Sequence, residues 1–139
     1  MFGWGKPAPF DPYNLAHPQR DTAIIALAGP VSNILLAIVV SLLWRVLPIP
    51  PTLTAVFLFL IRINVTLALF NLIPVPPLDG SKILAGILNR GSGRDFENFG
   101  GGNSLLLLLL LLIPIFSGHS LASLLISPVT NVLLGVLIP

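Results

Sequence analysis

The stretch Asn71-Leu-Ile-Pro-Val-Pro-Pro-Leu-Asp-Gly80 decides the fold, because three prolines followed by a carboxylate interrupt a long apolar segment. Proline lacks the N–H that a helix needs and pushes the preceding residue out of helical conformation, which predicts an extended break over 74–80. Irregular backbone at membrane depth is tolerated only where protein or a water-filled cavity surrounds it. Asp79 lies at the end of this break, and Gly80 would allow another chain or a ligand to come close.

The composition is that of a membrane protein. Of the 139 residues, 55% are hydrophobic and 9% are charged, and the mean hydropathy is +0.97. Soluble domains carry about 25% charged residues, which argues against a soluble globular fold. The absence of cysteine removes disulfide scaffolds, thiolate metal sites and cysteine nucleophiles. The net charge of +2 comes from scattered residues, with no basic run that could follow a phosphate backbone, which excludes nucleic acid as a partner.

Two apolar segments, 22–47 and 53–73, are long enough to span a bilayer, which takes about 20 residues. Small and polar side chains form one stripe in each segment, and stripes of this kind let helices approach closely in lipid. We therefore expect the two stripes to face each other. The first consists of Gly29, Asn33, Ala37 and Ser41, and the second of Asn64, Ala68 and Asn71.

Two residues strain these predicted spans. Pro30 should bend the first helix, because it frees a backbone carbonyl one turn earlier. Arg62 lies deep in the second segment, where a charged side chain costs at least about 2.5 kcal/mol unless it pairs or reaches the interface.

The rest of the chain flanks these spans. We interpret 1–21 as a Pro-rich linker, 81–103 as a short helix with a Gly-rich loop, and 104–138 as C-terminal hydrophobic helices. The fold class predicted for the single domain 1–139 is therefore all-α: a polytopic membrane helix bundle whose Pro-rich helix break carries the Leu-Asp-Gly motif at 78–80. The basic residues indicate the orientation of the bundle. One, Arg45, lies near the turn between the two spans, and five lie before the first span or after the second: Lys6, Arg20, Lys82, Arg90 and Arg94. The positive-inside rule then puts the Asp79 region on the cytoplasmic side of the cell membrane.

Asp79 has two interpretations from its position alone. It could cap the helix that starts at Ser81, which is a common role for aspartate. It could also be functional, because an ionisable residue within a membrane segment is by default a functional candidate.

Three motifs together resemble the site-2 protease family of intramembrane zinc metalloproteases. The string Asn-Leu-Ile-Pro-Val-Pro-Pro-Leu-Asp-Gly at 71–80 is similar to the family's N-x-x-P-x-P-P-L-D-G signature. Ala-Gly-Pro-Val-Ser-Asn at 28–33 resembles the A-G-P-x-x-N segment of the preceding core helix. Residues 3–21 are similar to the linker that leads into that helix in small prokaryotic members.

The resemblance implies a zinc-dependent peptidase that cuts membrane-protein helices inside the bilayer. Asp79 would match the third zinc ligand, and Asn71 the polar residue that opens the motif and steadies the substrate or the oxyanion. Gly29 and Asn33, with Pro30, would match the helix-packing motif beside the site. Pro74, Pro76 and Pro77, with Gly80, would hold Asp79 at a fixed depth.

The chain departs from the family pattern in its other zinc ligands. Those ligands and the general base lie on an HExxH helix, and this sequence has two histidines, His17 and His119, 102 positions apart, and one glutamate, Glu97. Both histidines are expected at a loop or interface rather than on a metal. In the family the HExxH helix precedes the linker, so we expect either that the chain lacks this helix or that it is a relative without catalysis.

The leading functional hypothesis is the C-terminal core of an intramembrane zinc metalloprotease that acts on membrane-protein helices in the lipid bilayer. The alternative is a non-catalytic membrane protein of the same fold that binds helices or acts as a scaffold. A small transporter or channel is a third possibility, but it predicts matching broken helices in two halves, and the sequence has one such break.

Overall fold

The computed structural model describes residues 17–88, 90–116 and 118–139, apart from a few side chains in the fourth helix and the hairpin. The elements in order are α1 (Pro18–Val46), α2 (Pro51–Asn71), α3 (Asp79–Ile87), α4 (Arg90–Leu112), β1 (Pro114–Phe116), β2 (His119–Ser120) and α5 (Leu121–Leu137). The fold is all-α, as the sequence predicts, with one short antiparallel hairpin added. Most of the predicted linker, 1–16, lies outside the described residues.

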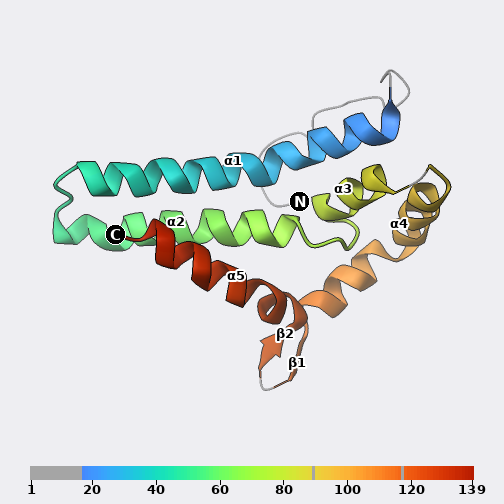
Figure 1. The fold of residues 1–139 in the computed structure, drawn as a ribbon. Helices are drawn as coiled ribbons and strands as arrows, with labels where there is room; N and C mark the ends of the chain where they lie inside the picture. Colours follow the sequence, from blue (N-terminus) through green and yellow to red (C-terminus); the bar gives the residue numbers. More distant parts are fainter. Residues whose placement is uncertain (1–16, 89, 117) are drawn as a thin grey trace.

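Two long helices form the frame of the molecule. α1 and α2 lie antiparallel along each other, and α3 continues beside α1 beyond the end of α2 (Figure 1). Proline in the first turn starts each long helix, where the missing N–H would have no partner, and the segment 47–50 forms the turn between them. α1 begins four residues before the expected span and continues as one helix through Pro30.

The core of the frame is made by α1, α2 and α5. Its buried members are Ala37, Val40, Ile61, Val65 and Leu134. The structure buries only part of each predicted stripe: the last two members on α1, Ala37 and Ser41, and the first two on α2, Asn64 and Ala68. The buried Asn64 amide donates to the carbonyl oxygen of Leu60 at 2.8 Å, which satisfies the side chain within its own helix.

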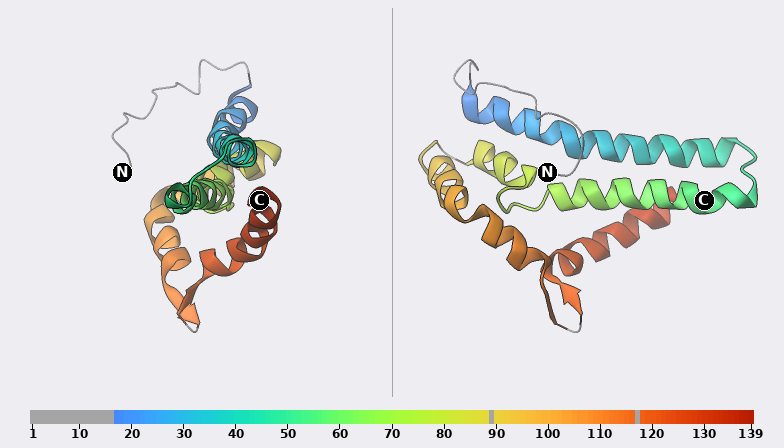
Figure 2. Two further views of the ribbon diagram at one scale, coloured as in Figure 1. Left: turned by 90° about the vertical axis from the view of Figure 1, so that its left-hand side faces the viewer. Right: turned by 180° about the vertical axis from the view of Figure 1, so that it is seen from behind.

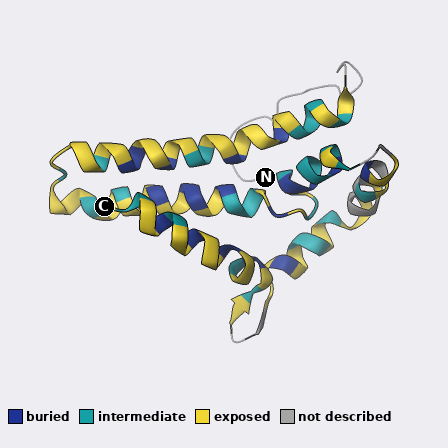
Figure 3. Ribbon diagram, viewed as in Figure 1, coloured by how far each residue is buried: buried dark blue, intermediate teal, exposed yellow. Residues whose placement is uncertain are grey.

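The outer faces of the helices remain apolar and exposed. Figure 3 shows exposed residues along the outer side of α1 and along much of α2 and α5. By length and composition, α1 and α2 are both able to cross a membrane, and less than a quarter of the most apolar window in each is buried. An apolar surface of this extent matches a lipid environment better than water.

The predicted loop over 91–103 is wrong, because α4 includes all of it. Glycine is a poor helix former, but tertiary packing can override propensity. Gly93 is buried against α3 and α1: a Cβ atom at this position would lie 2.6 Å from the Ala85 carbonyl oxygen and 3.2 Å from Gln19 Nε2. The glycine therefore permits a close helix contact, which the sequence alone does not reveal.

The C-terminal part returns to the frame. α4 and α5 diverge from one side of the α1–α2 pair and meet at the hairpin (Figure 2). α5 then packs on α2 and runs through Pro128 without interruption. Its last carbonyl groups are satisfied by α1: Ser41 Oγ donates to the Leu137 oxygen, and Arg45 Nη2 donates to the Val136 oxygen at 2.7 Å. These bonds replace partners that a helix end lacks.

We expect Gly93→Ala to lower the free energy of unfolding by about 1–3 kcal/mol, because the added methyl group has no room against Ala85. The matched control is Gly91→Ala in the same helix, where nothing lies within 4 Å of the added Cβ atom. That variant should be neutral or more stable by up to about 1 kcal/mol. Thermal unfolding in detergent, followed by circular dichroism, measures both. Equal effects of the two substitutions would contradict the packing of α4.

Candidate functional site

The break after α2 is a compact set of turns, not the extended segment that the prolines predict. The N–H groups beside the prolines make local bonds: Val75 donates to the Ile73 oxygen at 2.8 Å, and Leu78 donates to the Val75 oxygen at 2.9 Å. Proline removes its own donor but leaves its neighbours able to form turns, which explains the difference. Pro74 and Pro77 are exposed at the surface of these turns.

Two apolar side chains anchor the break to the rest of the molecule. Ile73 and Leu78, at its two ends, are buried in a second cluster formed with α4 and α5. The partners in that cluster are Leu111, Ala122 and Ile126. Because both ends are held, the residue that follows Leu78 has a defined position at the start of α3.

Gly80 allows the first turn of α3 to sit directly on the end of α2. A Cβ atom at position 80 would collide with the carbonyl oxygens of Leu72 and Ile73. Gly80 is buried, and no larger residue fits there without moving α3. The glycine next to the carboxylate is thus required by the backbone packing itself.

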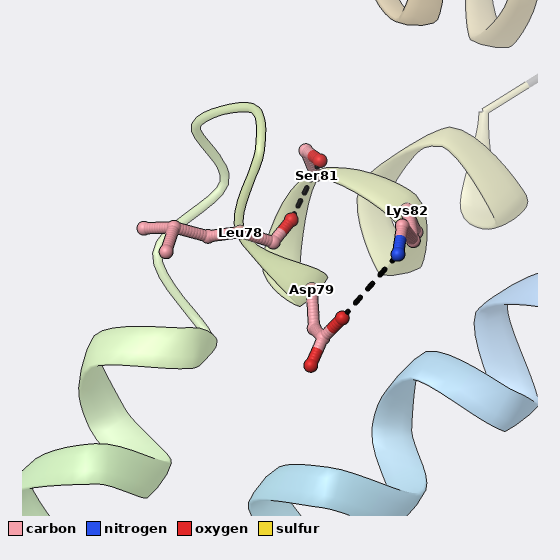
Figure 4. Close-up of polar contacts among 4 residues, drawn as sticks. All are labelled: Leu78, Asp79, Ser81 and Lys82. Carbon is pink, nitrogen blue, oxygen red and sulfur yellow. Dashed lines mark hydrogen bonds and ion pairs between the residues drawn. The ribbon is translucent and has the colours of Figure 1, made fainter. Parts of the chain in front are cut away.

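The two oxygens of the Asp79 carboxylate have different surroundings. Oδ1 lies 3.6 Å from Lys82 Nζ, one turn later in α3 (Figure 4). Oδ2 points towards α1, where a Cβ atom built on Gly29 would lie 3.4 Å away. The ion pair is partly solvated, since the side chains of Lys82 and Asp79 are 44% and 32% exposed.

The helix-cap interpretation of Asp79 is not what the structure shows. α3 begins at Asp79 itself, and Leu78, which has no polar side chain, occupies the cap position. Ser81 is also within the first turn, and its hydroxyl donates to the Leu78 carbonyl oxygen at 2.7 Å. Asp79 therefore contributes a negative charge to the first turn, which the helix dipole favours, but does not cap α3 with its side chain.

Of the residues predicted for the site, the structure brings Gly29 and Asp79 together. Gly29 differs from the expected pattern, because it is exposed and faces α3 rather than α2. Pro30 beside it is buried. Asn33 in α1 and Asn71, the last residue of α2, are half-buried, and neither bonds to Asp79 within the described part of the chain.

Lys82 is a site residue that the sequence analysis missed. The signal was present, because residues three apart on a helix are neighbours and an Asp–Lys pair at that spacing attracts. The sequence analysis used Lys82 only as a basic residue that indicates membrane orientation. In the structure Lys82 also forms an ion pair with the Asp79 carboxylate.

The residues present do not complete a zinc site. A catalytic zinc takes three protein ligands, and among the described residues no three His, Asp or Glu side chains gather. His17 is exposed at the start of α1, and His119 is exposed in β2. Asp79 alone has a suitable donor group at the break.

We expect Gly80→Ala to destabilise the protein by about 1–3 kcal/mol, because the Cβ atom would displace the first turn of α3 from the end of α2. Gly135→Ala in α5 is the control, since its Cβ atom meets nothing within 4 Å. Unfolding temperatures of both variants, measured in the same detergent, test this. If Gly80→Ala unfolds like the parent chain, α3 is not held against α2 in this way.

The region that contains the helix break is similar in sequence to known proteins. The model of peptidase family M50 matches residues 49–113, from the start of α2 through α4. The protein named "Putative zinc metalloprotease YwhC" from Bacillus subtilis is 32% identical over 99 residues, covering 65% of this chain and 45% of the relative. The protein named "Putative zinc metalloprotease MJ0611" from Methanocaldococcus jannaschii is 43% identical over 60 residues, covering 43% of this chain and 31% of the relative.

A third relative, from Synechocystis, also has a name that describes a zinc metalloprotease and is 39% identical over 64 residues, 46% of this chain and 17% of its own length. The chain thus spans less than half the length of each of these relatives. No solved structure matches it. The family match across the helix break and the three relatives support membership of peptidase family M50, the site-2 protease family.

Proposed function

We propose that this chain is the C-terminal core of an intramembrane zinc metalloprotease and contributes Asp79 as one zinc ligand. The observation that carries the proposal is the Asp79 carboxylate, held at the helix break with one oxygen towards α1. Family membership supports zinc-dependent proteolysis, and the names of the relatives point the same way. Substrates would be helices of membrane proteins, hydrolysed within the bilayer.

The proposed membrane placement rests on α1 and α2. Both helices are long and apolar enough to span, and the break that carries Asp79 follows directly after α2. Gly29, opposite Asp79, lies about 25 Å from the end of α1 at Val46, taking 1.5 Å per residue. Asp79 would then lie near one edge of the hydrocarbon region, on the cytoplasmic side by the distribution of basic residues.

The residues around Asp79 would orient its carboxylate. Lys82 holds Oδ1 through the ion pair, while Gly29, having no side chain, leaves space beside Oδ2. Gly80 and the anchored Leu78 keep the start of α3 in place. A carboxylate positioned in this way suits a single coordinating oxygen. The role of Asn71 beside substrate stays a proposal from the resemblance.

The other ligands must come from outside the residues described, because Asp79 is a lone donor there. The resemblance implies an HExxH helix for this purpose. A non-catalytic, helix-binding member of the family is the second candidate. The ion pair with Lys82 favours that alternative, since it already neutralises the carboxylate without a metal.

We expect the chain by itself to bind zinc weakly and to cleave no membrane substrate, because one carboxylate cannot hold a catalytic zinc. Co-expression with a membrane segment that carries HExxH should create a zinc site that closes on Asp79. In that complex, Asp79→Ala should weaken zinc binding roughly 100-fold or more, since loss of a mere outer-shell partner already weakens it 10–100-fold. Zinc content of the purified complex and cleavage of a model substrate helix are the measurements.

The matched control is Asp95→Ala, which removes an exposed carboxylate from α4. This variant should retain both zinc and cleavage. If the complex cleaves equally well with Asp79→Ala, Asp79 is not a ligand and the assignment of this site fails. If the intact complex binds zinc but never cleaves, the non-catalytic alternative holds instead.

The orientation is tested by cysteine labelling, which is clean because the chain has no cysteine of its own. Ser92→Cys, exposed in the first turn of α4, should react only with reagents that reach the cytoplasm. Pro50→Cys, exposed in the turn between α1 and α2, should react from the opposite side. Labelling of position 92 only from outside the cell would overturn the orientation.

A further inference from the structure

Arg62 is a charged residue on the exposed face of α2. Its side chain is exposed, and it forms no ion pair or hydrogen bond with any residue that the structure describes. The neighbouring residues Phe59 and Ile63 are exposed and apolar. Arg45, near the end of α1, differs, because it bonds to the end of α5. Arg62 is therefore a cation on an apolar surface.

The depth of Arg62 makes this arrangement costly in a bilayer. It lies about 16 Å along the helix axis from Pro51 and about 13 Å from Asn71, which is close to the middle of α2. The hydrocarbon core is about 30 Å thick, so both interfaces are far away. Arginine near a helix end can snorkel to the interface, but a central arginine needs an acceptor at its own depth.

The surface around Arg62 is suited to a helix. Ala55, Phe59, Arg62 and Thr66 follow one another at helical spacing and are all exposed, so they form one stripe along α2, which we call the Arg62 stripe. Small and hydroxyl side chains such as Ala55 and Thr66 permit close approach of a second membrane helix. The buried face of α2 is a different one, formed by Ile61, Asn64, Val65 and Ala68.

This chain offers no described Asp or Glu side chain at the depth of Arg62. Asp21 lies in the first turn of α1, Asp79 in the first turn of α3, and Asp95 in the polar first half of α4. Figure 1 shows the starts of α1, α3 and α4 beyond the end of α2, away from its middle. A second copy of the chain meets the same limit, because its described carboxylates lie at the same levels.

We propose that the Arg62 stripe docks a transmembrane helix of another protein that carries an Asp or Glu near the middle of the bilayer. The proposal rests on the part of the proposed function that places α2 across the membrane. The partner carboxylate would accept hydrogen bonds from the guanidinium group, and Ala55 and Thr66 would let the two helix backbones approach. This surface lies on α2 itself, whereas Asp79 follows the break beyond its end.

The test uses the full chain, reconstituted in phosphatidylcholine vesicles and labelled with a donor at Pro50→Cys. The probes are acceptor-labelled Leu-Ala transmembrane peptides with one central Glu, Gln or Leu. Energy transfer should show roughly tenfold tighter association of the Glu peptide than of the Leu peptide, with the Gln peptide between them. Arg62→Leu should abolish this preference, and Arg62→Lys should retain part of it. Asn131→Leu, which removes an exposed polar residue from α5, is the matched control and should change nothing.

Several results would overturn the proposal. Equal binding of the Glu and Leu peptides would show that the stripe does not recognise a carboxylate. If Arg62→Leu leaves the preference for the Glu peptide intact, the peptide carboxylate is recognised elsewhere and not by Arg62. Energy transfer can also be measured between two labelled copies of the chain. If that transfer depends on Arg62 and the Glu peptide does not compete with it, the stripe serves self-association instead.

A separate measurement distinguishes failure of this inference from failure of the proposed function. A nitroxide at Ile63→Cys, next to Arg62 and exposed, should be accessible to oxygen and protected from a water-soluble nickel reagent. If the nitroxide is instead accessible to the nickel reagent, α2 does not span the membrane and both proposals fail. If it reads as buried in lipid while no Glu preference is found, only the docking proposal falls.

Discussion

The arrangement of this protein depends on one close backbone contact, that of Gly80 with the carbonyl oxygens of Leu72 and Ile73. The contact stacks the start of α3 on the end of α2, so the chain changes helix without leaving the side of α1. A side chain at position 80 would separate the two helices. Burial of Ile73 and Leu78 among residues of α4 and α5 then fixes the turns that join them.

The position of the Asp79 carboxylate follows from this contact. Because Asp79 precedes Gly80 in the first turn of α3, its side chain is directed to the surface of α1 at a residue that has no side chain. Lys82 takes one oxygen and leaves the other beside Gly29. The motif Leu-Asp-Gly therefore combines an apolar anchor, a partly exposed carboxylate and a packing residue in three consecutive positions.

Polar groups on the apolar frame are satisfied in different ways. Asn64 forms a hydrogen bond within its own helix. Ser41 and Arg45 donate hydrogen bonds to carbonyl oxygens at the end of α5. These bonds tie the last helix of the chain to the first, and they keep hydrogen-bonding groups from facing lipid unpaired. Arg62 has no such solution among the described residues, which is why its stripe on α2 points to a partner rather than to the interior of the fold.

The amino-acid sequence by itself determined the fold class of this protein and indicated its resemblance to the site-2 protease family. Apolar segments of spanning length predict the two long helices, and the spacing of prolines, aspartate and glycine at 71–80 predicts both the break and the site-2 protease family. These features are local, so they can be interpreted without knowing what packs against them. Even so, the ends of helices shifted by several residues, because capping depends on the exact turn geometry.

Tertiary structure alone decided the features that depend on contacts between distant segments. Residues 91–103 belong to α4, with Gly93 packed against α3, although their glycine content predicts a loop. The pairing of Asp79 with Lys82 and its approach to Gly29 depend on how α3 sits on α1. Whether a polar residue is satisfied also depends on packing, which separates Arg45 from Arg62 although both lie in apolar helices. The local sequence pattern indicates which secondary structure a segment can form. Contacts between side chains of distant segments depend on how the helices pack.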